Sequence, residues 1–343
     1  MLILVAISPI VQAANSAWGL PEGFMRQWAH AWGGFTFYDI IMPLFIFMCG
    51  AAVPLAMRRR LTPEGRPGKG FFRHIAVRLG MLWVFGMVVQ GNLLTLDTMK
   101  ISPFNNTLQA IAVGYVFVAL AQLLPRLWHR VAAAVLCVVV YGVLMAAIGD
   151  YSKEGNVAQV VEQWILRHIL PEGSSALATH GYTWFLTSLM FVAMTFAGSF
   201  ATEILQRKES GARKAGFLAG YGAAMLAAGW ALSPWVPVIK HVYTVSFSLQ
   251  AMGWCVLALA ALYAVVDLAG LRRGMGVVEL WGRTALTAYM VWHPFRSAIK
   301  SAAGVFTQGL AHLANEKVAA FAAAVLAAVF VHYILVVRNR LRG

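Results

Sequence analysis

The chain has 343 residues, of which 60% are hydrophobic and only 12% charged, and its mean hydropathy is +0.70. Soluble domains carry about 25% charged residues, and the deficit runs along the whole chain, which excludes a soluble domain with a single anchor. The net charge of +14 would suggest a nucleic-acid partner in a soluble protein, but in a membrane protein it indicates basic loops on one side of the bilayer, so we expect no nucleic acid.

Apolar runs long enough to cross a hydrocarbon core of about 30 Å as helices recur along the chain, and the ten-residue alternation of membrane β-barrels is absent. The pattern predicts an all-α, polytopic transmembrane helix bundle of about ten spans, forming a single domain over residues 1–343. The predicted spans, in chain order, are 1–14, 35–57, 75–95, 104–124, 131–149, 181–205, 215–233, 243–267, 277–299 and 317–337.

The first predicted span is short for a helix that crosses a bilayer. It reads either as a signal peptide ending in the cleavage motif Val11-Gln12-Ala13, although the basic segment of such peptides is missing, or as the remainder of a helix that starts upstream. We favour the second interpretation, so the first helix is expected to be truncated at its N-terminus.

Alternate loops carry most of the 27 lysines and arginines, which predicts that these loops and both termini are cytoplasmic. The residues expected inside are Arg58, Arg59, Arg60, Arg66, Lys69, Arg73, Arg78, Arg126, Arg130, Arg207, Lys208, Arg213, Lys214, Arg272, Arg273, Arg283, Arg338, Arg340 and Arg342. Those expected on the other side are Arg26, Lys100, Lys153, Arg167, Lys240, Arg296, Lys300 and Lys317.

The longest segment expected outside is 150–180. Its apolar residues fall near helical spacing, which favours a short amphipathic helix on the membrane surface, with an irregular loop as the alternative. The three cysteines, Cys49, Cys137 and Cys255, lie in apolar runs without CxxC spacing, so we expect core residues rather than a metal site or a disulfide framework.

Ionisable groups at membrane depth are costly and are therefore candidates for function. Asp39 lies about one turn into its span, and it is either functional or satisfied by neighbouring hydroxyls and amides. His293 lies within the ninth span, where a hydrogen-bonded core histidine is the favoured interpretation. Glu279 and Arg283, four residues apart, are expected to pair.

Two groups of polar amides flank one short loop on the outer side. They are expected to face each other near His30 and either to line a polar cavity or to join helices by hydrogen bonds. The first group is Gln90, Gly91 and Asn92, and the second is Asn105, Asn106 and Gln109.

His30 stands in a predicted outer loop between Trp28 and Trp32 and before Gly33 and Gly34. The tryptophans suit the membrane interface. A neutral imidazole there can take a proton from an attacking amine or hydroxyl, or can itself attack a thioester. By spacing alone this signal is weak, because most loop histidines have no chemical role.

Five stretches resemble the bacterial relatives of heparan-alpha-glucosaminide N-acetyltransferase, a family of multispanning membrane acetyltransferases, and they occur in family order. These stretches are HAWGGFTFYDIIMPLFIFMCGAAVP (30–54), VVQGNLLTLD (88–97) with NNTLQAIAVGY (105–115), YTWFLTSLMFVAMTFAG (182–198), YTVSFSLQAMGWCVLALAALYAVVD (243–267) and GRTALTAYMVWHPF (282–295). The basic LD-x-x-RG-like segment that usually precedes the first span in this family is absent.

The resemblance implies that His30 corresponds to the active-site histidine of the family. It implies transfer of an acetyl group from cytoplasmic acetyl-CoA to an amino sugar or glycan across a bacterial inner membrane, and a homodimer. On this interpretation Asp39 orients the imidazole, while the oxyanion is stabilised by an amide among Asn92, Asn106 and Gln109. The phosphates of acetyl-CoA are expected to meet Arg58, Arg59, Arg60, Arg66 and Arg78, because arginine binds phosphate through two parallel donors.

Two other functions remain open. A transporter or flippase for a sugar or a lipid-linked saccharide fits the same composition, although we find no clear inverted repeat or interrupted helix pair. An O-acyltransferase of a surface polysaccharide would keep the donor and change only the acceptor. The bilayer, acetyl-CoA and a glycan acceptor are the expected partners, and no metal is expected.

Overall fold

The computed structural model describes residues 1–62, 64–177 and 182–341, and these ranges contain helices and no β-strand. The predicted all-α class is confirmed. Three parts of the sequence predictions lie outside the described residues, namely the end of the expected loop at 178–180, the start of the expected span at Gly181, and Arg342.

The chain divides into two compact units. Unit 1 contains residues 1–29, 36–41 and 271–343, and unit 2 contains residues 30–35 and 42–270. The single domain expected over 1–343 stays a prediction.

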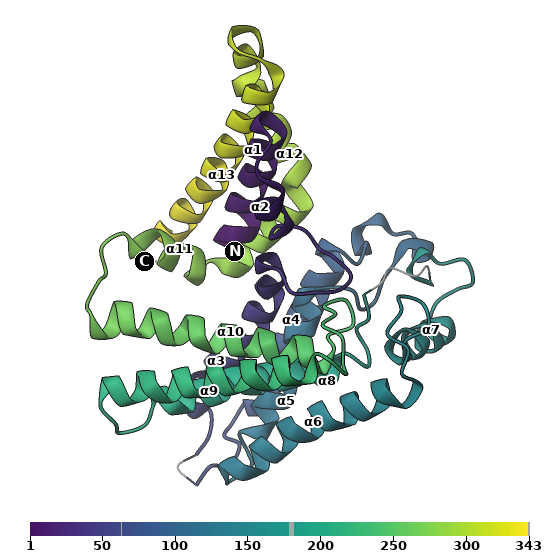
Figure 1. Ribbon diagram of the computed structural model, residues 1–343, viewed down its shortest axis with the longest axis vertical. Coiled ribbons are helices and arrows are strands. Elements are labelled where there is room, and N and C mark those ends of the chain that lie inside the picture. The colour runs from purple at the N-terminus through teal and green to yellow at the C-terminus, as the bar shows by residue number, and fades with distance from the viewer. Residues whose placement is uncertain (63, 178–181, 342–343) are drawn as a thin grey trace. The chain divides into compact units, whose positions relative to one another are not determined.

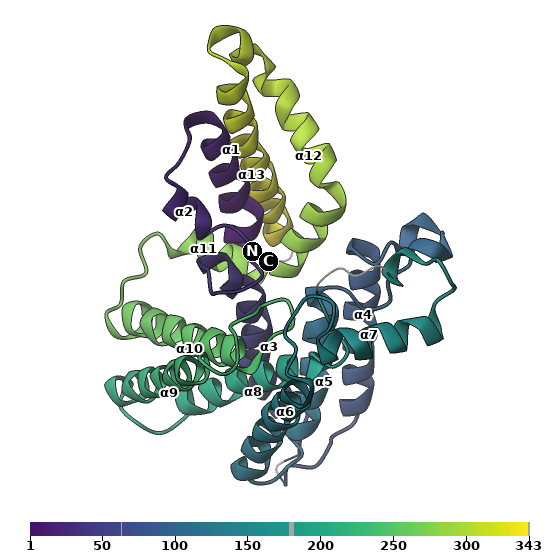
Figure 2. The ribbon, with the colours of Figure 1, turned by 45° about the vertical axis from the view of Figure 1, so that its right-hand side comes forward.

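Unit 1 is built on three helices that run side by side, α1, α12 and α13 (Figure 1 and Figure 2). Its elements are η1 (Ile3–Ile7), α1 (Ser8–Trp18), α2 (Glu22–Arg26), η2 (Phe37–Ile40), α11 (Met275–Arg283), α12 (Ala285–Leu313) and α13 (Glu316–Arg340). Apolar side chains from η1, α11, α12 and α13 form its core, among them Val5, Trp281, Trp292 and Val331. Burial of this surface is the main force that holds the unit together.

The ninth predicted span, 277–299, is wrong as one continuous helix and at its C-terminal end, because it is broken inside and its second helix runs on. The chain leaves helical geometry at Thr284, where φ is −108° and ψ is 17°, and the Thr284 hydroxyl donates to the Leu280 carbonyl. The short helix α11 therefore ends before α12 begins, and α12 continues through Pro294 to Leu313. The predicted pair of Glu279 and Arg283 is confirmed, with Nη2 and Oε1 2.5 Å apart.

Unit 2 contains the remaining helices. They are α3 (Ile41–Arg58), α4 (Phe71–Val89), η3 (Leu93–Thr95), η4 (Thr98–Lys100), α5 (Thr107–Ala121), α6 (Leu127–Ile148), α7 (Val157–Ile169), η5 (Ser175–Leu177), α8 (Ser188–Leu205), α9 (Gly211–Leu232), α10 (Val245–Leu262) and η6 (Tyr263–Leu268). Helices α9 and α10 pack along their whole length in both ribbon views (Figure 1 and Figure 2).

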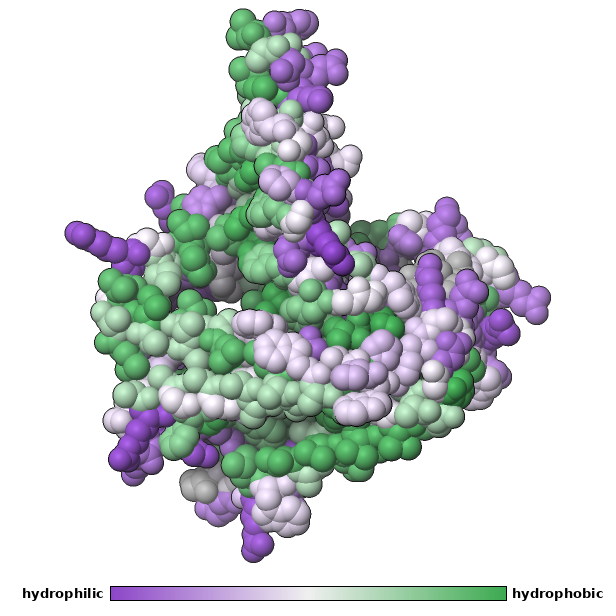
Figure 3. Space-filling model, in the orientation of Figure 1, coloured by the Kyte–Doolittle hydropathy of each residue, from purple (hydrophilic) through white to green (hydrophobic). Residues whose placement is uncertain are grey.

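Helix α8 is the centre of unit 2 and α6 is at its edge. In the most apolar stretch of each helix, 67% of the residues are buried in α8 but only 11% in α6. The outer face of α6 is a band of valines and leucines, visible as a hydrophobic strip in Figure 3. An exposed apolar face of this length is typical of a helix that meets lipid.

Seven helices in the described part of the chain are long and apolar enough to cross a membrane, judged by length and composition. They are Phe37–Arg58, Phe71–Val89, Leu127–Ile148, Ser188–Leu205, Gly211–Leu232, Val245–Leu268 and Glu316–Arg340. Two shorter apolar helices, Ile3–Trp18 and Thr107–Ala121, coincide with the first and fourth predicted spans. Helix α12 is not among the seven, so the number of spans and the side of each terminus stay predictions.

Side-chain caps explain where several helices begin. The side chains of Asn106, Asn156, Ser210 and Asn315 each accept a backbone N–H in the first turn of α5, α7, α9 and α13, and so satisfy donors that the helix itself leaves unpaired. The amphipathic helix expected within 150–180 is confirmed as α7.

Candidate functional site

The segment that carries His30 packs against the loop that leads into α10. Residues 30–35 lie along residues 237–244, and the N–H of Gly34 donates to the Val238 carbonyl at 2.8 Å. The ring of Phe35 contacts an aromatic ring at the start of α10, with centroids 5.5 Å apart. Two segments that are about 200 residues apart in the chain therefore form one surface.

The loop 237–244 is held in one conformation by its own hydrogen bonds. The Thr244 hydroxyl donates to the Pro237 carbonyl at 2.7 Å and accepts from the Ile239 N–H at 3.0 Å. From α6, the Tyr141 hydroxyl donates to the Val242 carbonyl. A loop that is pinned at both ends and in the middle can hold a side chain in a fixed position.

Lys240 is the side chain that this loop presents to His30. Its Nζ lies 3.1 Å from His30 Nδ1, and the lysine is only 5% exposed, whereas the imidazole is exposed. An ammonium would donate to Nδ1 and leave the ring proton on Nε2, whereas an uncharged amine would accept the Nδ1–H and leave a lone pair on Nε2. Only the second arrangement makes Nε2 a base or a nucleophile.

Aromatic rings form the wall beside this pair. The Trp32 ring stacks on His241, with centroids 4.9 Å apart and planes at 23°, and Tyr182 contacts the same imidazole at 4.3 Å. Between Lys240 and α10, Tyr243 takes a left-handed φ of 47°. A bulky residue rarely adopts this conformation, and such strain is typical of positions held by their surroundings at functional sites.

No protein-family model matches this chain, and no curated protein sequence matches it. What His30 and Lys240 can do chemically is therefore inferred from their geometry. Sequence reasoning placed Lys240 only among the basic residues outside. A signal that points to it is its position in an apolar stretch, Val236 to Val245, where a cation must find a partner.

Asp39 belongs to unit 1, where its carboxylate accepts hydrogen bonds at the start of a helical turn. Its Oδ2 accepts from the Thr36 N–H at 3.0 Å and from the Thr36 hydroxyl at 2.8 Å, and the residue is 1% exposed. This capping box begins the helical turn η2 that leads into α3. One expectation for Asp39 is that neighbouring hydroxyls and amides satisfy its carboxylate, and for Oδ2 this is what the structure has. The other expectation, that Asp39 orients His30, stays a prediction.

The two amide groups do face each other, as expected, since Asn105 Nδ2 donates to the Gln90 carbonyl at 3.1 Å. Asn106 and Gln109 are buried, however; Asn106 caps α5, and Gln109 Oε1 accepts from the Asn105 N–H at 3.0 Å. The Asn106 amide donates to Gln109 Oε1 at 2.8 Å and to Asn105 Oδ1 at 3.1 Å, while its oxygen accepts two backbone N–H groups. Both donors of Asn106 are engaged, so it has no hydrogen to offer to an oxyanion.

Asn92 lies elsewhere, on the wall of a polar cavity that we call the α7 cavity, of about 290 Å³. Two buried residues of α7, Gln159 and Glu162, line it together with the aromatic rings of Tyr182 and Trp184. Further residues that line it are Lys100, Ser102, Phe104, Asn105, Gln163, Leu166, Ser175 and Ala176. Because Tyr182 also touches His241, the α7 cavity is adjacent to the His30 surface.

Glu162 is the buried carboxyl group of this cavity. Its Oε2 accepts from the backbone N–H groups of Trp184 at 2.9 Å and Phe185 at 3.0 Å. Burial raises the pKa of Glu162 to about 7, and these two hydrogen bonds limit the rise because they favour the charged form. Sequence reasoning assigned no role to Glu162, which sits on the polar face of α7.

Two of the five arginines proposed for acetyl-CoA come together. The Arg78 guanidinium lies over the ring of Tyr115 at 4.7 Å, and Arg60 acts electrostatically on the same tyrosine and on His74. The Tyr115 hydroxyl is buried and has no hydrogen-bond partner in the described part of the chain. The other three, Arg58, Arg59 and Arg66, are exposed.

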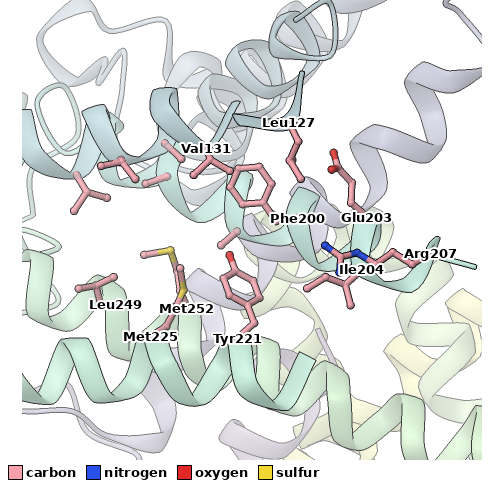
Figure 4. A pocket seen from close by; sticks show the side chains of 15 residues that line it. Leu127, Val131, Phe200, Glu203, Ile204, Arg207, Tyr221, Met225, Leu249 and Met252 are labelled. Atoms are coloured by element: carbon pink, nitrogen blue, oxygen red, sulfur yellow. The ribbon is translucent and has the colours of Figure 1, made fainter. Parts of the chain in front are cut away.

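A larger, apolar crevice of about 400 Å³ lies between α6, α8, α9 and α10 (Figure 4). Figure 4 shows Leu127, Val131 and Phe200 on one wall and Tyr221, Met225 and Met252 on the other, with Glu203 and Arg207 at one end. Glu203 also pairs with Arg130. A mostly apolar lining with the charges of Glu203 and Arg207 at one end suits a hydrocarbon chain.

Proposed function

We propose that this chain is a membrane-embedded acetyltransferase that moves an acetyl group from cytoplasmic acetyl-CoA to an amino sugar or glycan on the other side of a bacterial inner membrane. The observation that carries the proposal is the exposed His30 imidazole with its Nδ1 3.1 Å from the buried Lys240 Nζ. The resemblance of residues 30–54 to the heparan-alpha-glucosaminide N-acetyltransferase family supports the same residue by an independent route.

In direct transfer the acceptor nitrogen attacks the carbonyl carbon of the thioester, so that a C–N bond forms while the C–S bond breaks. The proton lost by the nitrogen passes to His30 Nε2, and CoA leaves as a thiolate that later takes up this proton. The contact between Lys240 Nζ and His30 Nδ1 fixes the ring, and this mechanism requires the uncharged amine, which accepts the Nδ1–H and leaves the lone pair on Nε2.

In two-step transfer His30 Nε2 itself attacks the thioester, and the acetylimidazole then acylates the acceptor. Both routes need an accessible Nε2 and the same hydrogen bond at Nδ1. Rapid acid quenching followed by peptide mass spectrometry separates them, because only the second route adds 42 Da, roughly the mass of one acetyl group, to the His30 peptide.

Arg60 and Arg78 are the residues that we propose for the phosphates of acetyl-CoA. The guanidinium of Arg78 is held against Tyr115, so less conformational entropy is lost when it binds than for a freely moving surface arginine. The buried Tyr115 hydroxyl adds a donor or acceptor at the same place.

The test is transfer of radiolabelled acetyl from acetyl-CoA to a panel of amino sugars by the purified protein in lipid nanodiscs. We expect the His30→Ala variant to lose at least about a hundredfold in rate, the range of general base catalysis. The matched control is His168→Ala, which removes an exposed histidine of α7. Transfer by the His30 variant at the wild-type rate would remove His30 from the mechanism.

The same preparation tests the two alternatives. A ligand that binds only the folded state raises its stability, so CoA should raise the melting temperature of an acetyltransferase and leave that of a sugar transporter unchanged. Acceptors that carry hydroxyl groups but no amine distinguish an O-acyltransferase, which would use them at the rate seen with amino sugars.

A further inference from the structure

Unit 1 contains a cavity that the proposed function does not use. It has a volume of about 420 Å³, and we call it the α12 cavity. Its walls come from η1, α1, η2, α12 and α13, and its lining includes Ser8, His293, Arg296 and Lys300. The volume is in the range of small-molecule sites, well above what one ion requires.

All the ionisable groups on α12 that line this cavity are basic. His293, Arg296 and Lys300 follow one another at intervals of three and four residues, which places them on one face of the helix. Among the described residues that line the cavity there is no aspartate or glutamate, and neither Arg296 nor Lys300 forms an ion pair in the described part of the chain. The cavity therefore has a positive potential without internal compensation.

Two contacts hold this basic face in place. The Arg296 guanidinium lies over the ring of Trp292, 5.8 Å from its centroid, and Trp292 is buried in the core of unit 1. His293 Nδ1 lies 3.2 Å from the Tyr289 carbonyl, which can only accept, so the proton is on Nδ1. The other ring nitrogen, Nε2, is left for a ligand or for a second proton.

The position along α12 restricts where a ligand can come from. Arg296 and Lys300 lie 11 and 15 residues beyond Ala285, about 17 and 23 Å along the helix axis at 1.5 Å per residue. Helix α12 is not among the helices in the described part of the chain that are long and apolar enough to cross a membrane, and its two cations suit a polar cavity or a headgroup layer. A headgroup layer contains phosphate esters, and a polar cavity admits such esters from solution.

We propose that the α12 cavity binds the oxyanion of a phosphate or sulfate ester, with Arg296 and Lys300 as its main contacts. Arginine binds such a group through two parallel N–H donors and lysine adds a point charge. The hydroxyl of Ser8, which lines the cavity from α1, can donate to a remaining oxygen. The volume beyond the anion accommodates a glycerol or a sugar unit. The ester is either free in solution or the headgroup of an anionic lipid.

Two probes separate these sources. Delipidated protein in detergent is titrated with phosphatidylglycerol and followed by native mass spectrometry, and it is titrated separately with glycerol 1-phosphate and followed by its melting temperature. Binding of the lipid alone identifies a headgroup site, and binding of the soluble ester identifies a site for a free ligand. If wild-type protein binds neither probe, the proposal is overturned.

The variants then assign the site. We expect R296Q/K300Q to bind the active probe at least tenfold more weakly than wild type. Arg340→Gln, the control for each single variant, removes one positive charge from the same unit, about 24 Å along α13 from Ala324, and should bind as wild type does. Lys300 is exposed, so K300Q alone should fold and lose part of the affinity should the double variant fail to fold. Equal affinity of wild type and K300Q, with R296Q also equal, would reject the assignment.

Discussion

Lys240 Nζ lies 3.1 Å from His30 Nδ1, and the lysine is buried whereas the imidazole is exposed. Most histidine bases donate their Nδ1–H to a carboxylate or a carbonyl, both of which can only accept. A lysine in this place can either donate or accept, according to its protonation. The reactivity of His30 Nε2 is therefore coupled to the charge of Lys240.

This coupling makes a prediction about substitution of Lys240. Lys240→Gln supplies an uncharged acceptor for the Nδ1–H, whereas Lys240→Met has similar length and no polar atom. We expect the Met variant to transfer acetyl at least about tenfold more slowly than the Gln variant, because an unanchored imidazole loses its tautomer and its orientation. The two variants should differ in kcat and have the same KM for acetyl-CoA.

The dependence of kcat on pH provides the control. Glutamine does not titrate, so a step of the wild-type profile that belongs to Lys240 should be missing from the Gln variant, whereas a step that belongs to another group should remain. Equal rates for the Met and Gln variants, with unchanged profiles, would show that Lys240 serves only to support the loop.

Glu162 makes a prediction about stability. In the unfolded chain its pKa is the ordinary 4.5, and burial raises it to about 7 in the folded protein. Between these values the folded state retains a proton that the unfolded state has released, so the free energy of unfolding falls as the pH rises through this window. A shift of this size corresponds to about 3 kcal/mol.

The measurement is the melting temperature of the purified protein between pH 5 and pH 8. Glu162→Gln keeps an oxygen for the N–H groups of Trp184 and Phe185, so we expect its melting temperature to change less with pH and to exceed that of wild type at pH 8. Glu172→Gln, which changes an exposed residue, should follow the wild-type profile. Parallel profiles for wild type and the Glu162 variant would contradict the prediction.

Sequence reasoning worked best where an element is determined by its own residues. Apolar runs bounded by charges and caps predicted α9 and α13 to within a few residues, and α7 was predicted from spacing alone. The predicted span 277–299 does not show the break at Thr284, because there a single residue leaves helical geometry. It also ends too early, because the basic face of α12 interrupts the apolar pattern while the helix continues to Leu313.

In the candidate site, too, only what a local stretch determines could be predicted. The stretch around His30 indicates this histidine as a functional candidate, but its partner Lys240 is 210 residues away in the chain, and no local pattern joins the two. Asn106 and Gln109 are expected in an oxyanion site because the two amide groups flank one loop near His30. In the structure the Asn106 side chain caps α5, which is a common use of asparagine at that position.

The close packing of α3 on α8 gives the last prediction. A Cβ atom on Gly198 would lie 1.9 Å from the Phe47 carbonyl oxygen, and one on Gly50 would lie 1.9 Å from that of Thr195. Since both obstacles are backbone atoms, the helices must separate to admit a methyl group. The hydrogen bond from the Thr202 hydroxyl to the Ala51 carbonyl, at 2.7 Å, would lengthen with them.

We therefore expect Gly198→Ala to destabilise the protein by about 2–3 kcal/mol, within the range for overpacked cores, although alanine is the better helix former. Small residues at such crossings let membrane helices approach closely. The control is Gly80→Ala on α4, where a Cβ meets nothing within 4 Å and helix propensity alone should leave stability unchanged or raised. Unfolding in a denaturing detergent measures both variants, and equal stability of the two would mean that α3 and α8 do not pack as closely as the structure has them.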